Sequence, residues 1–161
     1  MRKGLLSKIF KFIGVITCVV ITPYLLASGL SITEYRSAKP LACISLVDNE
    51  FSLSFIHSVS LTPVSDEYRL LVNDGHYQIL QTKERFVAHG QGLPSLIDEP
   101  DAVAFEHRDG QFILHLKRNI SNLIVRTDKR FENKLHTGDR TINLNIWPDA
   151  GLGIKPVGSC Q

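Results

Sequence analysis

Two Asp-Gly pairs set between alternating apolar segments constrain this fold more than any other sequence feature. Asp74-Gly75 and Asp109-Gly110 are the residue types that two-residue type I′ hairpin turns require. The flanking segments alternate apolar and polar residues, as strands with one buried face do. We therefore expect two antiparallel hairpins whose register is set by these turns.

The chain beyond residue 35 continues this pattern and shows no helical period. Short alternating or β-branched runs recur between turn residues. Such spacing predicts an all-β fold, either an antiparallel sandwich or a small barrel. The expected strands cover residues 51–57, 67–72, 77–82, 85–89, 102–107, 112–117, 122–127 and 141–147.

The two turns also predict cross-strand pairs. Leu70 should face Ile79 in the first hairpin. In the second hairpin, alternation puts His107 and His115 on opposite faces of the sheet, so they cannot share a metal ion. One face of the second hairpin should lie in the core, and its apolar members are Val103, Phe105, Phe112, Leu114 and Leu116.

The N-terminal segment has the pattern of a membrane anchor. Residues 1–11 hold four of the chain's 18 basic residues, and residues 12–33 form a run of 22 without a charge. About 20 such residues span a bilayer, and the basic flank should stay in the cytoplasm. We expect a single-pass membrane protein with a cytoplasmic tail (1–11), one N-terminal transmembrane helix (12–33), a linker (34–40) and an exported β domain (41–161). A cleaved signal peptide is the alternative.

Export would change the expected state of the cysteines. Cys18 lies in the apolar segment, which leaves Cys43 and Cys160 near the two ends of the exported part. Oxidising compartments favour pairing of such residues. We expect a Cys43–Cys160 disulfide, with two free thiols as the alternative.

Charge and length exclude several classes of function. Beyond residue 11 the chain carries 14 basic and 16 acidic side chains, which argues against a nucleic-acid partner. A chain of 161 residues is long enough for about one domain and leaves no room for a separate nucleotide-binding half.

Sequence motifs for catalysis and metal binding are absent. His57 and Ser58 are adjacent, so in a strand they point to opposite faces and do not pair as base and nucleophile. The sequence has no Gly-x-Ser-x-Gly elbow and no zinc-ligand spacing. We expect no catalytic residue, no metal and no cofactor. A site that joins His57 with His89, Asp66 or Glu67 stays open as the rival.

Two segments carry a more specific pattern. Residues 51–68 match Phe-x-Leu-x-Phe-Ile-His-Ser-Val-x-x-Thr-Pro-Val-x-Asp-Glu-Tyr, and residues 90–94 match Gly-x-Gly-Leu-Pro. With Asp109–Phe112 and Leu123–Arg126, these blocks resemble a family of small exported bacterial proteins of unknown function. The resemblance covers about residues 43–147.

The resemblance implies a role rather than a chemical activity. Members of the family are typically encoded beside TAXI-type TRAP transporters, which pair a fused membrane permease with a soluble solute-binding protein. This implies a non-enzymatic accessory protein that is tethered to the inner membrane, with residues 41–161 in the periplasm. Such a protein would bind the permease, the solute-binding protein or the solute. The alternative is an envelope metal-binding protein or hydrolase that uses His57. The candidate binding residues are His57, Ser58, Thr62, Pro63, Glu67, Gly90, Gly92 and Pro94.

The two blocks should also meet in space. Two chain reversals separate the strand that ends near His57 from the one that ends near His89, so both ends should lie at the same sheet edge. We expect the 57–67 connection to pack against the 89–94 loop. His57 or Thr62 should form a hydrogen bond across the contact, because a buried polar group without a partner costs roughly 1–3 kcal/mol.

Overall fold

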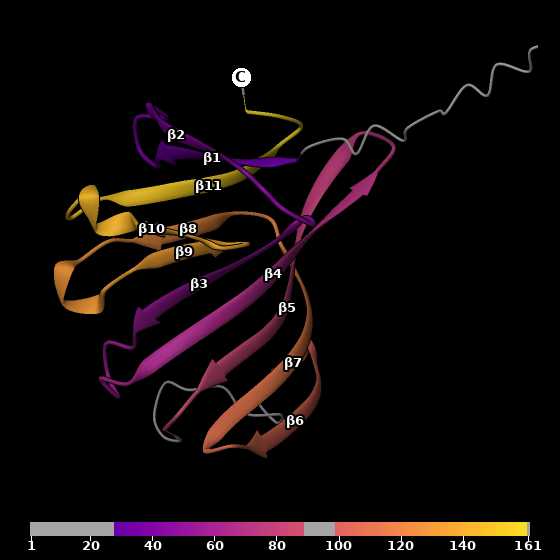
Figure 1. The fold of residues 1–161 in the computed structure, drawn as a ribbon, viewed down its shortest axis with the longest axis vertical. Helices are drawn as coiled ribbons and strands as arrows, with labels where there is room; N and C mark the ends of the chain where they lie inside the picture. Colours follow the sequence, from indigo (N-terminus) through magenta and orange to yellow (C-terminus); the bar gives the residue numbers. More distant parts are fainter. Residues whose placement is uncertain (1–27, 89–98, 161) are drawn as a thin grey trace, which may run out of the picture.

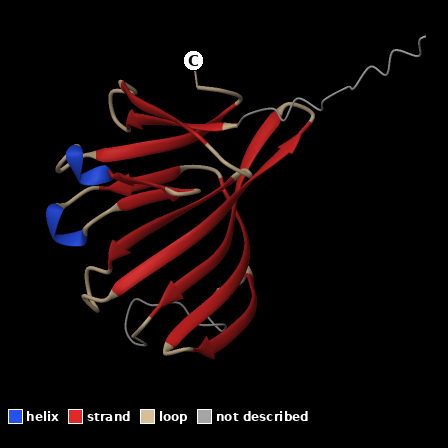
Figure 2. Cartoon of the chain, in the orientation of Figure 1, coloured by secondary structure: helices blue, strands red, loops and turns tan. Residues whose placement is uncertain are grey.

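The computed structural model describes residues 28–88 and 99–160, and these residues form two antiparallel β-sheets (Figure 1). One sheet has four strands and the other has seven, and Figure 2 shows that two short helical turns are the other regular elements of this part. The prediction of an all-β fold is confirmed, and two separate sheets correspond to the sandwich rather than to the barrel.

The four-stranded sheet has the order β2-β1-β11-β8. It joins the start of the described chain to its end, because β1 pairs with β11 over six residues. Its strands are β1 (Gly29–Glu34), β2 (Pro40–Ser45), β8 (Leu123–Arg126) and β11 (Gly151–Val157).

The seven-stranded sheet has the order β10-β9-β3-β4-β5-β7-β6. Its long strands β4, β5 and β7 extend beyond the four-stranded sheet, toward the lower end of Figure 1. Its strands are β3 (Glu50–Ile56), β4 (Pro63–Asn73), β5 (His76–Phe86), β6 (Ala102–Arg108), β7 (Gln111–Ile120), β9 (Lys134–Thr137) and β10 (Arg140–Asn143).

Both Asp-Gly hairpins form in the expected register. Leu70 pairs with Ile79 in the β4–β5 hairpin, and Phe112 pairs with His107 in the β6–β7 hairpin. Asp74, Gly75, Asp109 and Gly110 all have φ between 49° and 78°, as a type I′ turn requires. The turn chemistry therefore specified two of the longest strand pairs.

The predicted core face of the second hairpin is correct except at one residue. Leu114 and Leu116 are buried, but Val103 is 55% exposed. The register shifts between Ala102 and Ala104, so Leu116 pairs with Ala102 instead of Val103. This bulge turns Val103 out of the core.

A second bulge joins two expected strands into one. The segments 77–82 and 85–89 were expected to be separate, but β5 runs without a break from His76 to Phe86. Its register against β4 shifts between Gln81 and Lys83. The extra residue inverts the alternation, which is why the sequence resembles two strands there.

At the other end of the fold, the expected strand over 141–147 is too long. Asn143 ends β10, and its side chain accepts a hydrogen bond from the Asn145 backbone N–H and so caps the turn η2 (Leu144–Ile146). The other short helical turn is η1 (Lys129–Phe131).

The folded domain begins before residue 41, where the sequence analysis placed the end of a membrane segment and a linker. β1 begins at Gly29, inside the expected membrane segment 12–33, and its Leu30 and Ile32 are fully buried in the core. The expected linker 34–40 is instead the connection between β1 and β2, which form a hairpin. Residues 12–27 lie outside the described residues. The part of the chain that the structure describes holds no helix with the length and apolar character that a bilayer span requires.

The predicted disulfide is present. Cys43 on β2 bonds to Cys160 beyond β11, with a Cα–Cα distance of 5.5 Å and a sequence separation of 117 residues. Gly29 lies against this bond, because a Cβ atom at that position would sit 2.9 Å from the Cys160 sulfur. The disulfide therefore ties the two ends of the described domain together.

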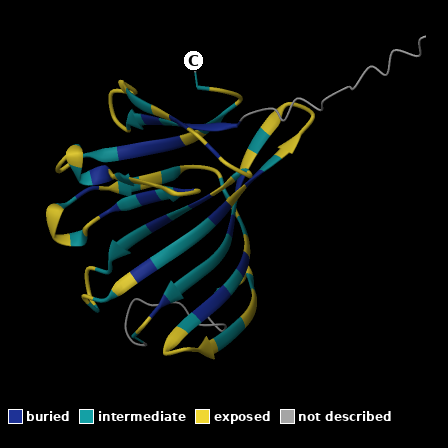
Figure 3. Ribbon diagram, viewed as in Figure 1, coloured by how far each residue is buried: buried dark blue, intermediate teal, exposed yellow. Residues whose placement is uncertain are grey.

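Buried apolar residues form two clusters. The larger one fills the space between the two sheets, and it includes Phe51, Leu53, Tyr68, Leu70 and Ile79 of the seven-stranded sheet. We call the face of this sheet that carries these residues the inner face. The smaller cluster lies at the lower end of the sheet, around Phe86 and Leu114. Figure 3 shows the buried stretches of β1, β11, β4 and β7 that contribute to the two clusters.

Candidate functional site

A cavity of about 430 Å³ opens between the edge strand β8 and the inner face of β3 and β4. It lies next to the region where the four-stranded sheet stops covering the seven-stranded one. Most of its wall is apolar. The apolar lining residues are Leu53, Phe55, Ile56, Leu123, Ile124, Val125, Phe131 and Leu144.

A single carboxylate lines this apolar cavity. Alternation along β4 puts Val64, Asp66 and Tyr68 on the inner face, and Asp66 pairs with Leu53 of β3. Its Oδ2 accepts a hydrogen bond of 3.2 Å from the Tyr68 hydroxyl. Its Oδ1 is buried and has no hydrogen-bond partner among the described residues. Asp66, a residue of the cavity wall, therefore carries one unsatisfied acceptor.

The position of Asp66 changes its acidity. Burial raises its pKa to about 6, although the Tyr68 hydroxyl, the Arg118 charge and the Gln81 amide act in the opposite direction. Burial also raises the pKa of Tyr68 far above its usual value, and the neighbouring Asp66 charge adds to this effect. Near neutral pH, Asp66 is mostly ionised and Tyr68 remains a hydrogen-bond donor.

Further acidic residues surround the same part of the sheet. Glu84 of β5 is the direct cross-strand partner of Asp66. Burial raises the pKa of Glu84 to about 7, and the charges of Asp66 and Glu99 contribute. We call Asp66, Glu84, Glu99 and Asp101 the acidic group.

Arg118 of β7 is the cation that offsets this acidic group. Its guanidinium donates to Glu99, to Asp101 Oδ2 at 3.3 Å and to Gln81 Oε1 at 3.3 Å. Its charge also lowers the pKa values of Asp66 and Glu84. One arginine therefore faces four carboxylates in this part of the fold.

The connection between β3 and β4 forms part of the cavity rim. His57 and Ser58 both line the cavity. The His57 Nδ1 atom accepts a hydrogen bond of 3.2 Å from the Ser60 backbone N–H, and the Thr62 and Ser60 hydroxyls lie 2.8 Å apart. The backbone closes the turn as well, because the His57 N–H donates to the Thr62 carbonyl at 2.9 Å. His57 thus holds the turn in shape.

The expected hydrogen bond from His57 or Thr62 to the 89–94 loop is not among the described contacts. Gly90, Gly92, Pro94 and His89 all lie outside the described residues. The two strand ends do reach the same edge of the sheet, since Ile56 pairs with Pro63 and Val64 pairs with Phe86. The described hydrogen bonds of both side chains stay within their own turn.

Glu67 does not belong to the cavity. It lies on the outer face of β4, where it forms ion pairs with Lys83 at 3.0 Å and Arg85 at 2.6 Å. Burial acts to raise its pKa, but these two cations lower it overall. Adjacent residues of a strand face opposite sides, so the structure does not bring Glu67 together with His57, and it is Asp66 that lines the cavity. Pro63 starts β4 and is exposed.

The outer face also carries a serine–histidine pair that was not predicted from the sequence. Ser54 Oγ lies 2.7 Å from His136 Nε2, and His136 Nδ1 lies 3.0 Å from the Thr141 hydroxyl. The pair has the distance of a nucleophile and its base, but the third member is a neutral hydroxyl instead of a carboxylate. The only hint of this pair in the sequence was the alternation of β3, which places Ser52 and Ser54 on the face opposite the buried Phe51 and Leu53.

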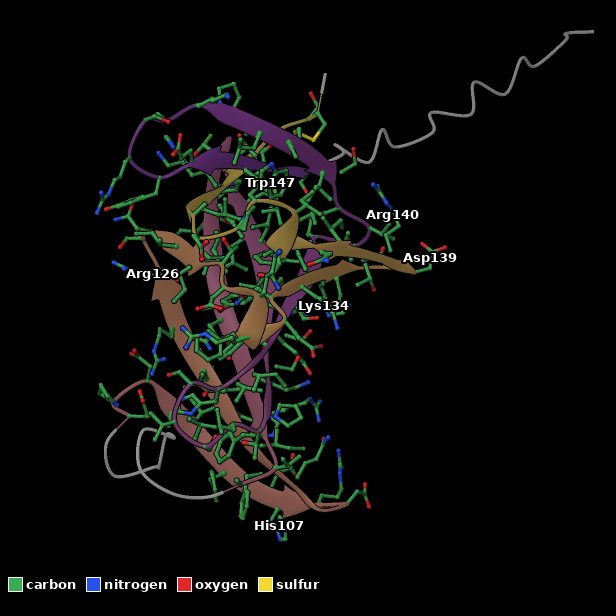
Figure 4. The ribbon with its side chains drawn as sticks, turned by 90° about the vertical axis from the view of Figure 1, so that its left-hand side faces the viewer. His107, Arg126, Lys134, Asp139, Arg140 and Trp147 are labelled. Carbon is green, nitrogen blue, oxygen red and sulfur yellow. A yellow bond between two sulfur atoms is a disulfide. The ribbon has the colours of Figure 1, made fainter. Side chains whose placement is uncertain are left out.

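Two basic side chains mark the sides of the cavity. Arg126 ends β8 and Lys134 begins β9, and both line the cavity. Figure 4 shows them at similar heights on the two sides of the molecule, with His107 far below. Lys134 pairs with Glu132 at 3.1 Å. Within the described ranges, no group of three or more His, Cys, Asp or Glu residues could hold a metal ion.

Comparison with known protein families identifies the family of this chain and the part of the chain that the family covers. A family model described as a domain of unknown function, DUF1850, matches residues 51–144. The chain belongs to this family. The DUF1850 range includes every lining residue of the cavity and nearly all of the seven-stranded sheet, whereas β1, β2 and β11 fall outside it. No curated protein and no solved structure matches the chain.

Proposed function

We propose that this protein is a non-enzymatic, membrane-tethered periplasmic accessory protein that supports TRAP-type solute uptake. In this proposal it binds the transported solute or a component of the transporter at the cavity between β8 and the inner face. The single observation that carries the proposal is that Asp66, whose Oδ1 is buried and unpartnered among the described residues, lines a mostly apolar cavity.

The cavity has the properties of a binding site for a small molecule. Such sites are concave and mostly apolar, measure about 300–1,000 Å³, and carry a few polar groups that orient the ligand. A volume of about 430 Å³ lies within this range. A carboxylate with a raised pKa in a cleft is a further mark of functional sites.

The disulfide supports an exported location. Disulfides persist in oxidising compartments such as the bacterial periplasm and are rare in the cytosol. The basic residues before position 12 and the uncharged run that follows supply the tether in this proposal. Since the folded domain begins with the buried Ser28, residues 12–27 are left for the span, and these sixteen residues are just below the usual range of length.

The transporter association rests on the resemblance of the two sequence blocks to proteins encoded beside TAXI-type TRAP transporters. The structure adds a reason to prefer binding over catalysis at His57. Its Nδ1 atom is engaged by the backbone of its own turn, which suits a structural role better than that of a base.

The proposal is tested by purifying the tagged full chain in mild detergent from the membranes of the bacterium that produces it. We expect the TRAP permease or its solute-binding protein to co-purify and to be identified by mass spectrometry. A tagged, unrelated single-pass periplasmic protein is the control for nonspecific recovery. Recovery of neither component, together with normal solute uptake in a deletion strain, would overturn the proposal.

A further inference from the structure

We propose that the cavity recognises an organic cation, whose ammonium group donates a hydrogen bond to Asp66 Oδ1 while its apolar body packs against the cavity wall. This inference rests on the proposed function, because it names the class of ligand that the same cavity takes. It depends on the geometry of Asp66, on the local balance of charge and on the composition of the wall.

The geometry of Asp66 leaves one position for a donor. Tyr68 occupies Oδ2, and Oδ1 is buried without a partner among the described residues. A buried acceptor is normally satisfied, and each exception calls for an explanation. A ligand N–H group in the cavity would supply the missing hydrogen bond.

The charge balance favours a cation over a neutral donor. Asp66 faces Glu84 across the β4–β5 pair, and Glu99 and Asp101 form ion pairs with Arg118. Like charges placed directly opposite one another in a sheet are destabilising. Arg118 is already shared between Glu99, Asp101 and Gln81, so an added positive charge beside Asp66 would relieve the excess of negative charge.

The wall favours a compact apolar body. Phe55 and Phe131 supply aromatic surface to the cavity, and Leu53 and Leu144 supply aliphatic surface. The basic residues Arg126 and Lys134 belong to β8 and β9, whereas Asp66 belongs to β4. The ammonium group is therefore assigned to the β4 side of the cavity, away from these two cations.

The probe that follows from this chemistry is benzylammonium, compared with benzyl alcohol and benzoate, which keep the ring and change the charge. Binding to the full chain in detergent is measured by ligand-observed NMR at neutral pH, with empty micelles as the reference. We expect benzylammonium to bind at least tenfold more tightly than either analogue, since hydrogen bonds between charged partners are the strong ones. Equal or tighter binding of benzoate would overturn the inference.

Two matched variants test the role of Asp66. Asp66→Asn should weaken benzylammonium binding at least tenfold, whereas Glu67→Gln makes the same change on the outer face and should alter it less than twofold. Circular dichroism establishes that both variants are folded. Unchanged binding of benzylammonium to Asp66→Asn would overturn the inference. If a variant misfolds, the comparison of the three probes on the unmodified chain still tests the inference.

Failure of this inference can be told apart from failure of the proposed function. If benzylammonium does not bind but a bulky residue at the cavity rim still lowers solute uptake, the cavity is functional and the cation assignment is wrong. If the rim variant also has no effect on uptake, both are wrong.

Discussion

Asp66 and Glu84 are direct cross-strand partners on the inner face of the seven-stranded sheet. Two carboxylates in this position repel each other, and burial penalises both charges. Burial is the main cause of the raised pKa values, about 6 for Asp66 and about 7 for Glu84, and the Asp66 charge adds to the rise at Glu84. The domain therefore holds an unfavourable acidic pair beside its largest apolar cluster, which is unusual unless the charge serves binding.

The first prediction is that Asp66→Asn stabilises the unliganded protein in a pH-dependent way. The folded-state pKa of Asp66 is raised from 3.8 to about 6, so its ionisation costs stability above that pH and nothing below about pH 4. The gain in unfolding free energy should be near zero at pH 4 and grow through pH 6. It should reach at most about 3 kcal/mol at pH 8. Urea denaturation at several pH values measures it.

Glu67→Gln is the matched control and should behave in the opposite way. The pKa of Glu67 is lowered by Arg85 and Lys83, so its charge stabilises the fold above its unfolded pKa, and this contribution is lost as the pH falls. The variant should be less stable than the parent at pH 8 and equal to it in acid. An Asp66→Asn variant that is less stable than the parent at pH 8 would contradict the account of the acidic pair.

The second prediction concerns the Cys43–Cys160 disulfide. It closes a loop with a sequence separation of 117 residues, and in the chain-entropy model such a loop contributes roughly 4 to 5 kcal/mol. Cys43→Ser should lower the unfolding free energy by about this amount, and reductant should have the same effect on the parent chain. Cys18→Ser serves as the control and should leave stability unchanged in oxidising buffer. Equal stability with and without reductant would argue against the bond.

The third prediction concerns the turn between β3 and β4. His57→Ala removes the acceptor for the Ser60 N–H and should lower the unfolding free energy by about 1 kcal/mol. His57→Asn should restore most of this loss, because an asparagine oxygen can accept from the backbone two or three residues on. Thermal melts of the two variants provide the measurement. If asparagine is no better than alanine, the role of Nδ1 in the turn is wrong.

Much of the seven-stranded sheet could be predicted because its signals are local. Asp74-Gly75 and Asp109-Gly110 encode turns that leave one choice of register. The bulges could not be predicted in the same way. An extra residue between Gln81 and Lys83 inverts the alternation, and nothing in the local sequence distinguishes this from the end of one strand and the start of another.

The four-stranded sheet was largely missed for a different reason. β1 carries no charge before Glu34 and continues the apolar N-terminal run, so Leu30 and Ile32 satisfy the pattern of a membrane span and of a buried strand equally well. β1 pairs with β11, whose partner residues lie more than a hundred positions away, and short-range patterns carry no information about such contacts.

The central residue of the site could have been found from the sequence. Val64, Tyr68 and Leu70 set the phase of β4, and this phase places Asp66, not Glu67, on the inner face. His57 and Ser58, which the sequence offered as candidate binding residues, line the cavity. The contribution of Arg118 and Glu84 could not be foreseen, because it depends on the order of β4, β5 and β7 in the sheet.

The central claim is that the cavity between β8 and the inner face supports solute uptake. Its most direct test is the initial rate of radiolabelled solute uptake by the TRAP transporter in cells that carry Ser58→Trp in the full chain. Ser58 lines the cavity, and Val59→Trp adds the same bulk at the next position of the turn, which is not part of the lining. We expect Ser58→Trp to lower the initial rate of uptake to that of a deletion strain and Val59→Trp to leave the rate unchanged. Wild-type uptake in the Ser58→Trp cells, with the protein present at its normal level, would contradict the account.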